Sequence, residues 1–158
     1  MISLKKRNQG FTIVELLIVI VVIGILALLV ITTYSGIQSK ARNSKRTSDI
    51  KSLQTHIEAF FSQNGYYPSR ADINNDAWLT TNMKSLDKNA LIDPKNPTQS
   101  NDVVAAAAAN SYAYAVTNSS DTSCESDDTT CAKYTLTATY EGTVNGSTTA
   151  VAKNLDGS

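Results

Sequence analysis

The sequence has very few of the side chains that proteins most often use for catalysis and metal binding. Its 158 residues include one histidine, two cysteines and one tryptophan. It lacks a glycine-rich phosphate loop, an HExxH pair and the nucleophile elbow of hydrolases. Two cysteines and the distant His56 are too few for a four-ligand zinc site. We therefore expect no enzyme, no cofactor and no resident metal.

The chain also lacks net charge, but its charges are unevenly distributed. Residues 1–64 carry five net positive charges and residues 65–158 carry five net negative ones. Phosphate binding requires clustered lysine and arginine, so the acidic part gives no support to nucleic-acid binding. The opposite charges favour contacts between the basic part of one molecule and the acidic part of another.

One long apolar run dominates the sequence. From Phe11 to Ile31 the chain is apolar except at Thr12, Glu15 and Gly24, and a basic KKR segment precedes it at 5–7. The run contains 21 residues. As a helix it is about 31 Å long, which matches a hydrocarbon core of roughly 30 Å. The run therefore predicts a transmembrane helix.

Two ordinary explanations of this run fit less well. A secretory signal peptide has an apolar run of about 7–15 residues followed by an A-x-A cleavage site, and no such site follows Ile31. A plain anchor explains the length but not Glu15, because an acid at a helix centre costs roughly 2.5–3.5 kcal/mol on insertion scales. We therefore predict that Glu15 is functional.

The segments KKRNQG and FTIVELLIVIVVIGILA together resemble the start of a type IV prepilin or pseudopilin. The resemblance covers about the first 30 residues. It implies a class III leader at 1–10, which a prepilin peptidase removes after Gly10, and N-methylation of the new first residue, Phe11. The glutamate that the family has at its fifth mature position corresponds to Glu15. One departure is Thr32, where many members have proline, so we expect no proline kink there.

The apolar run continues into an amphipathic helix. A stripe of residues spaced by three or four positions indicates one buried face: Ile50, Leu53, Ile57, Phe60 and Phe61. Asn64-Gly65 is a typical helix end. We predict one helix over 11–64, with its transmembrane and assembly part at about 11–33. Other residues are expected to face solvent or a neighbouring subunit: Lys40, Arg42, Lys45, Arg46 and His56.

Residues 65–158 are predicted to form a head with a turn-rich αβ loop, an antiparallel sheet and a disulfide loop. Residues 111–116 and 132–144 alternate apolar and polar side chains, as strands do. Asn145-Gly146 predicts a type I′ hairpin leading to a third strand. The alanine-rich segment 103–110 fits either a short helix or a packed loop. The fold class is α+β, with the long N-terminal helix packed against the sheet as in the type IV pilin fold.

Cys124 and Cys131 are predicted to form a disulfide, because an exported domain favours oxidised cysteines. Such a bond contributes roughly 2–3 kcal/mol in the chain-entropy model. Two free buried thiols are the alternative. The loop between them contains Glu125, Asp127 and Asp128, which are weak calcium candidates because three acids in a loop are more often solvated.

These observations predict a structural subunit, a type IV pilin. It would polymerise through its N-terminal helix into a helical homo-oligomeric surface filament, or fimbrium, for adhesion, twitching motility or DNA uptake. The alternative is a pseudopilin of a type II secretion or competence machine. An alternative of another class is a single-pass, membrane-anchored binding module.

The resemblance also implies partners and a location. The partners are a prepilin peptidase and methyltransferase, an assembly platform and minor pilins. Before assembly the chain would cross the cytoplasmic membrane once, with its head exported; afterwards it would belong to a cell-surface pilus. In the polymer, Glu15 would pair with the free α-amine of Phe11 on an adjoining subunit, because a buried charge must be paired.

Overall fold

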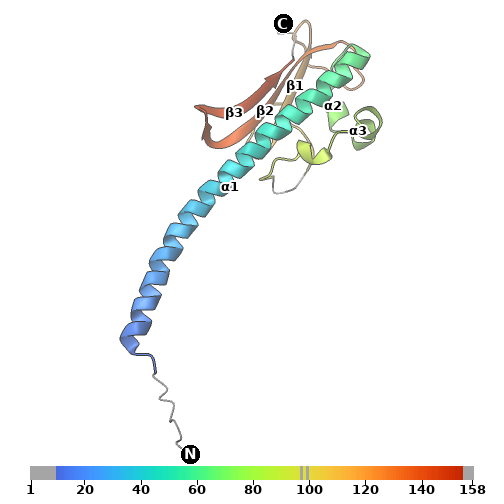
Figure 1. Cartoon of the computed structure of the whole chain (residues 1–158). Helices are drawn as coiled ribbons and strands as arrows, with labels where there is room; N and C mark the ends of the chain where they lie inside the picture. The colour runs from blue at the N-terminus through green and yellow to red at the C-terminus, as the bar shows by residue number, and fades with distance from the viewer. Residues whose placement is uncertain (1–9, 97, 99, 155–158) are drawn as a thin grey trace, which may run out of the picture. The chain divides into compact units, whose positions relative to one another are not determined.

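The computed structural model describes residues 10–96, 98 and 100–154. Most of the expected leader (1–9) lies outside this range, as do Pro97, Gln99 and residues 155–158. The chain divides into two compact units, Met1–Gln38 and Ser39–Ser158. We call them the N-terminal unit and the C-terminal unit. Helix α1, Ile13–Asn64, contributes to both (Figure 1).

In the N-terminal unit, α1 is apolar on all sides. Its large hydrophobic side chains between Phe11 and Ile37 are 46–86% exposed. The most apolar window has a mean hydropathy of 3.4, so the helix is long and apolar enough to cross a membrane. A soluble core helix of that composition would be mostly buried, and this window is not buried. The helix starts two residues later than the sequence predicts, because Thr12 precedes its first turn as a cap.

In the C-terminal unit, α1 buries one face. Ile50, Leu53, Ile57 and Phe60 are each at most 4% exposed, and Phe61 packs against them while partly buried. The helix ends at Asn64. Gly65 follows with φ +80°, a conformation that favours glycine, and its N–H donates to the Phe61 carbonyl at 2.7 Å.

Three short helices connect α1 to the sheet. They are α2 (Arg70–Ile73), α3 (Asp76–Asn82) and the 3₁₀ helix η1 (Lys88–Leu91). Ser69 and Asp72 form a capping box at α2, and Asn75 and Asp87 cap the other two. Leu79 of α3, Leu91 of η1 and Leu86 between these two helices place their side chains in the core.

The sheet has three antiparallel strands in the order β1-β2-β3 (Figure 1). They are β1 (Tyr112–Asn118), β2 (Cys131–Val144) and β3 (Ser147–Lys153). The inward side chains are buried against α1 and the short helices: Tyr112, Tyr114, Val116, Tyr134, Leu136 and Ala138. The α+β fold predicted from the sequence, a long helix packed against an antiparallel sheet, is therefore confirmed.

The sequence predicts the hairpin turn, but it leaves the structure of the alanine-rich segment open. Asn145 and Gly146 have φ of 50° and 81°, as a type I′ turn requires. Residues 103–110 form a loop rather than a short helix, with bridges from Val104 to Ala113 and from Ala108 to Ser111. Val103 is buried, but residues 105–109 are exposed, so most of this loop is not packed as the other expectation had it. An isolated helix this short is unstable in water even when rich in alanine.

Candidate functional site

The segment before α1 is exposed. Gly10 and Phe11 precede the helix, and the Phe11 side chain is 86% exposed. A Cβ atom added at Gly10 would meet no atom within 4 Å. The fold of this chain therefore does not require glycine at position 10.

Glu15 lies in the first turn of α1 and forms a capping box with Thr12. The Thr12 backbone N–H and hydroxyl donate to Glu15 Oε2 at 2.9 and 2.7 Å. The Glu15 N–H donates in return to Thr12 Oγ1 at 3.2 Å. A negative charge at a helix N-terminus also interacts favourably with the helix dipole. This contact was not predicted from the sequence, although Thr-x-x-Glu is its known signature.

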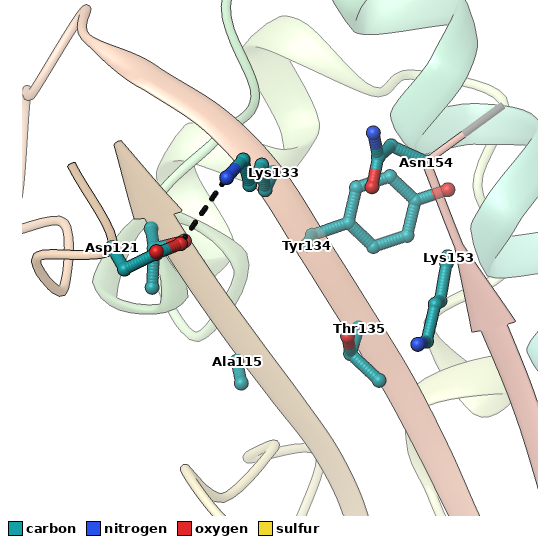
Figure 2. A pocket seen from close by; sticks show the side chains of 8 residues that line it. Ala115, Asp121, Lys133, Tyr134, Thr135, Lys153 and Asn154 are labelled. Atoms are coloured by element: carbon teal, nitrogen blue, oxygen red, sulfur yellow. Dashed lines mark hydrogen bonds and ion pairs between the residues drawn. The ribbon is translucent and has the colours of Figure 1, made fainter. Parts of the chain in front are cut away.

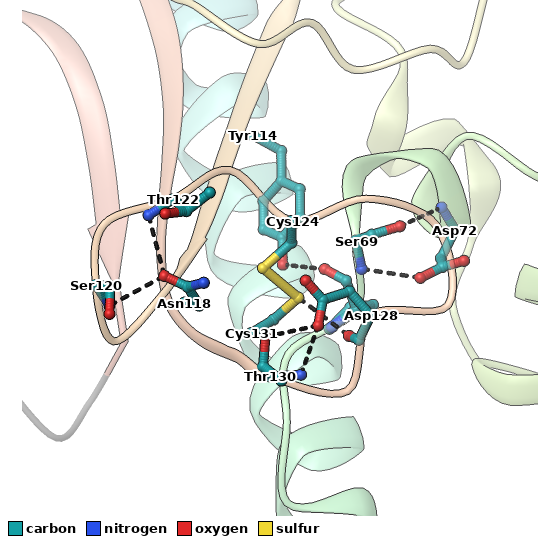
Figure 3. Close-up of a disulfide and its surroundings, with 11 residues drawn as sticks. Ser69, Asp72, Tyr114, Asn118, Ser120, Thr122, Cys124, Asp128, Thr130 and Cys131 are labelled. Atoms are coloured by element: carbon teal, nitrogen blue, oxygen red, sulfur yellow. Dashed lines mark hydrogen bonds between the residues drawn. A yellow bond between two sulfur atoms is a disulfide. The ribbon is translucent and has the colours of Figure 1, made fainter.

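The structure joins Cys124 and Cys131 in a disulfide, with their Cα atoms 5.9 Å apart (Figure 3). Both residues are buried, at 7% and 1% exposure. The bonded loop is anchored at both ends, because the Cys124 N–H donates to the Val116 carbonyl and the Tyr67 N–H donates to the Cys131 carbonyl. The second bond holds the loop beside the C-terminal end of α1.

The calcium candidates in this loop do not converge. Among the described residues, one group of potential metal ligands lies close together, and it consists of Cys124, Asp128 and Cys131. Both sulfur atoms in that group belong to the disulfide. Asp128 accepts hydrogen bonds from the Thr130 backbone N–H and hydroxyl, which lower the pKa of its carboxyl group (Figure 3).

A buried ion pair joins α1 to the loop after η1. Arg46 is 1% exposed, and its guanidinium donates to Asp93 at 2.7 and 2.9 Å. Arg46 also donates to Asn43 Oδ1 and to Glu141. The expectation that Arg46 faces solvent or a neighbouring subunit is therefore wrong. Its guanidinium is fully paired inside the C-terminal unit, which makes its burial tolerable.

Glu141 near the end of β2 extends this network. Arg42 donates to both of its carboxylate oxygens at 2.6 and 2.7 Å, so Arg42 is also paired inside the chain rather than free. Lys95 lies 3.2 Å from the same carboxylate. Chiefly the Arg42 hydrogen bonds, helped by Lys95 and Arg46, lower the pKa of Glu141 to about 2. We call Arg42, Arg46, Asp93 and Glu141 the ion network.

A signal for the buried arginine was present in the sequence. Arg46 lies four residues before Ile50, so it continues the stripe that Ile50, Leu53 and Ile57 form on one helix face. A cation in line with an apolar stripe enters the core when acids from distant segments reach it. The sequence does not reveal that Asp93 and Glu141 do so, because they lie 47 and 95 residues away.

Two tyrosine hydroxyl groups of the sheet also donate hydrogen bonds to carboxylates of α1. Tyr112 donates to Asp49 at 2.7 Å, and Tyr134 donates to Glu58 at 2.8 Å. Burial, together with these carboxylates, raises the pKa of both tyrosines. These contacts orient the helix on the sheet.

The hollows of the C-terminal unit contain no catalytic arrangement among their described residues. One hollow of about 250 Å³ beside β1 and β2 is lined by lysine, tyrosine and threonine, and Lys133 there pairs with Asp121 at 3.3 Å (Figure 2). His56 is half-buried, and its Nδ1 lies 2.9 Å from the Ser52 carbonyl. Neither place brings a nucleophile and a base together.

Comparison with known proteins identifies the N-terminal segment. The family described as prokaryotic N-terminal methylation motif matches residues 5–31. Type II secretion system core protein G of Dickeya chrysanthemi is 36% identical over 66 residues, 42% of this chain and 43% of that protein. Core protein G of Aeromonas hydrophila is 40% identical over 65 residues, 41% of this chain and 46% of its own length.

A pilin matches the chain as well. The type IV major pilin protein PilA of Myxococcus xanthus is 38% identical over 68 residues, 43% of this chain and 31% of that protein. The chain spans less than half the length of each of these curated relatives. No solved structure matches the chain.

The proteins that match this chain are named as core proteins of a secretion system and as a major pilin. The chain has the methylation motif, a long apolar helical segment and, in its C-terminal unit, an antiparallel sheet packed against the C-terminal part of α1. It therefore carries the N-terminal methylation motif at residues 5–31 and is homologous, over about two fifths of its length, to type II secretion core protein G and to the type IV pilin PilA.

Proposed function

We propose that this chain is a structural subunit that polymerises through the N-terminal part of α1 into a helical filament. The observation that carries the proposal is the exposure of large apolar side chains on every side of the helix between Phe11 and Ile37. Apolar surface in water is unfavourable by roughly 25 cal/mol per Å². Lipid covers this surface before assembly, and the same helices of neighbouring subunits cover it afterwards.

Processing at Gly10 prepares the subunit for assembly. The methylation motif at 5–31 supports removal of the leader after Gly10 and methylation of Phe11. The exposed position of Gly10, and the absence of any atom that would meet a Cβ there, support the view that a processing enzyme requires this glycine. The fold itself does not.

Glu15 sets the axial register of the filament. Leader removal leaves a positive α-amine on Phe11, and methylation preserves that charge. The hydrogen bonds from Thr12 both go to Glu15 Oε2, so Oε1 is available to the ammonium of an adjoining subunit. The carboxylate then caps its own helix and pairs with its neighbour at the same time, which satisfies the charge in a dry bundle.

Between the two members of the family, the comparisons favour a pseudopilin of a type II secretion machine. Core protein G is matched from several bacteria, including Dickeya and Aeromonas. The surface pilus expected from the sequence keeps the support of the match to PilA of Myxococcus. These identities cover about two fifths of the chain, so the rest of the chain will decide between a short secretion filament and a long surface fibre.

Mass spectrometry and electron microscopy of the same cells test this proposal. We expect a mature N-terminal peptide that begins at Phe11 and carries one extra methyl group. We also expect filaments that contain the chain, and blocked processing in a Gly10→Val variant. An unprocessed chain that stays monomeric in the membrane would contradict the proposal and leave an anchored binding module. Long fibres shed from wild-type cells would favour the surface pilus.

A further inference from the structure

Among the exposed charges that no described ion pair uses, two sets lie at separate places in the C-terminal unit and have opposite signs. Lys40 and Lys51 on α1 are exposed, and no acid contacts either of them within the described residues. Glu125 and Asp127 in the disulfide loop are exposed, and no described cation contacts them. The other exposed acid near that loop, Asp121, pairs with Lys133.

The two lysines stand at the ends of a groove between α1 and the end of β2. The groove has a volume of about 490 Å³, and Val144 forms part of its lining. Between the lysines the helix presents the small side chains Ser44 and Ser48, which leave room for a segment from outside. Lys40 and Lys51 are about 16 Å apart along a helix with a rise of ~1.5 Å per residue. Each lysine has a flexible side chain that can bend towards the middle of the groove, where two acids of one loop fit.

The acidic loop of the same molecule cannot reach this groove. The bond from the Tyr67 N–H to the Cys131 carbonyl holds the loop beside the end of α1. Lys51 lies thirteen residues before that end, Asn64, which corresponds to about 20 Å of helix. That distance exceeds the Debye length of ~8 Å at physiological salt. The complementary charges therefore remain available to a second molecule.

We propose that the groove between Lys40 and Lys51 receives the acidic disulfide loop of a second copy of this chain. Lys40 and Lys51 pair there with Glu125 and Asp127. This inference rests on the proposed filament function and adds a contact between C-terminal units to the one between apolar helices. The two surfaces differ and lie at opposite ends of the unit, so the contact is head-to-tail and extends into a filament.

Carbodiimide cross-linking of purified filaments tests the contact directly. The reagent joins an ammonium and a carboxylate in contact through an amide bond, with loss of water. We expect cross-linked peptides that connect Lys40 or Lys51 with Glu125 or Asp127 in filaments. We expect none in the full-length mature chain kept monomeric in detergent. Absence of these peptides from wild-type filaments would overturn the proposal.

Charge reversal gives an independent test in the full chain. Lys40→Glu with Lys51→Glu, and Glu125→Lys with Asp127→Lys, should each lower filament yield roughly tenfold through like-charge repulsion. The four changes together should restore it. Lys84→Glu with Lys153→Glu, which makes the same charge change at other exposed lysines, should leave the yield unchanged. Equal melting temperatures in detergent exclude misfolding as the cause.

Three outcomes distinguish this contact from lipid binding and from failure of the proposed function. Normal filaments from the lysine variant, with weaker binding of its monomer to phosphatidylglycerol vesicles, would assign the groove to lipid and overturn the proposal. A wild-type chain that forms no filaments would instead contradict the proposed function itself. Filaments that form normally but never cross-link at these residues would contradict the groove contact alone.

Discussion

At the scale of single residues, Glu15 has two roles, and one carboxylate can perform both of them at the same time. Its carboxylate caps the helix through Thr12, as a Glu or Gln at the third helical position does. The same carboxylate supplies the negative charge that we propose to pair between subunits. Glutamine retains the first purpose and loses the second, so the two are separable by substitution.

We expect Glu15→Gln to keep the helix start and to abolish most filament assembly, because only the charge is removed. Thr12→Ala should have the opposite effect: it should weaken the cap by roughly 1 kcal/mol but retain assembly. Filament yield from equal amounts of membrane-inserted protein measures both effects. Normal yield from Glu15→Gln would show that the charge does not set the register.

At the scale of elements, the ion network fixes how α1 lies on the sheet. Arg42 and Arg46 on the helix hold Glu141 near the end of β2 and Asp93 in the connecting loop. A buried pair of this kind is not itself strong evidence of net stabilisation, but removing one partner leaves an uncompensated charge. The network therefore acts chiefly as a device that specifies one position for the helix.

The low pKa of Glu141 predicts a dependence of stability on pH. Its folded pKa is about 2, below the ordinary 4.5, so its contribution is complete above about pH 5. That contribution is lost as pH falls towards 2 and the carboxylate becomes protonated. Glu141→Gln should therefore melt at a lower temperature than the wild type at pH 7, and the difference should shrink towards pH 2.

Thermal melts of the mature chain in detergent, recorded by circular dichroism between pH 7 and pH 2, measure this difference. Asp102→Asn is a suitable control, because Asp102 is exposed and outside the network. A difference that stays constant over the whole pH range would show that the charge of Glu141 does not contribute.

At the scale of the whole molecule, the two units have separate purposes. The N-terminal unit exposes apolar side chains, which supply assembly. The C-terminal unit contains the described hydrophobic core, the disulfide and the ion network. The chain thus places the apolar surface for polymerisation in the N-terminal unit and the folded core in the C-terminal unit.

This division predicts that residues 39–158 fold without the N-terminal unit. Such a fragment should be monomeric and should melt cooperatively, because its core and its ion network lie within those residues. Sedimentation velocity and calorimetry measure both properties. An aggregated or unfolded fragment would mean that the apolar helix contributes to folding as well as to assembly.

Some of this protein was determined by its sequence alone, because the relevant forces act between near neighbours. The apolar length from Phe11 to Ile31, the stripe at Ile50, Leu53 and Ile57 and the Asn145-Gly146 turn are local patterns. Each predicts its element through helix period, membrane thickness or turn geometry. The motif around Gly10 and Glu15 is local in the same sense.

Only the tertiary structure decided which charges remain free. From the sequence, Arg42 and Arg46 are predicted to be exposed cations. In the folded chain, distant segments bring Glu141 and Asp93 into contact with them. Lys40 and Lys51, a few residues away on the same helix, stay exposed. The physical reason is that desolvation and pairing depend on contacts across 47 to 99 residues, which no local pattern encodes.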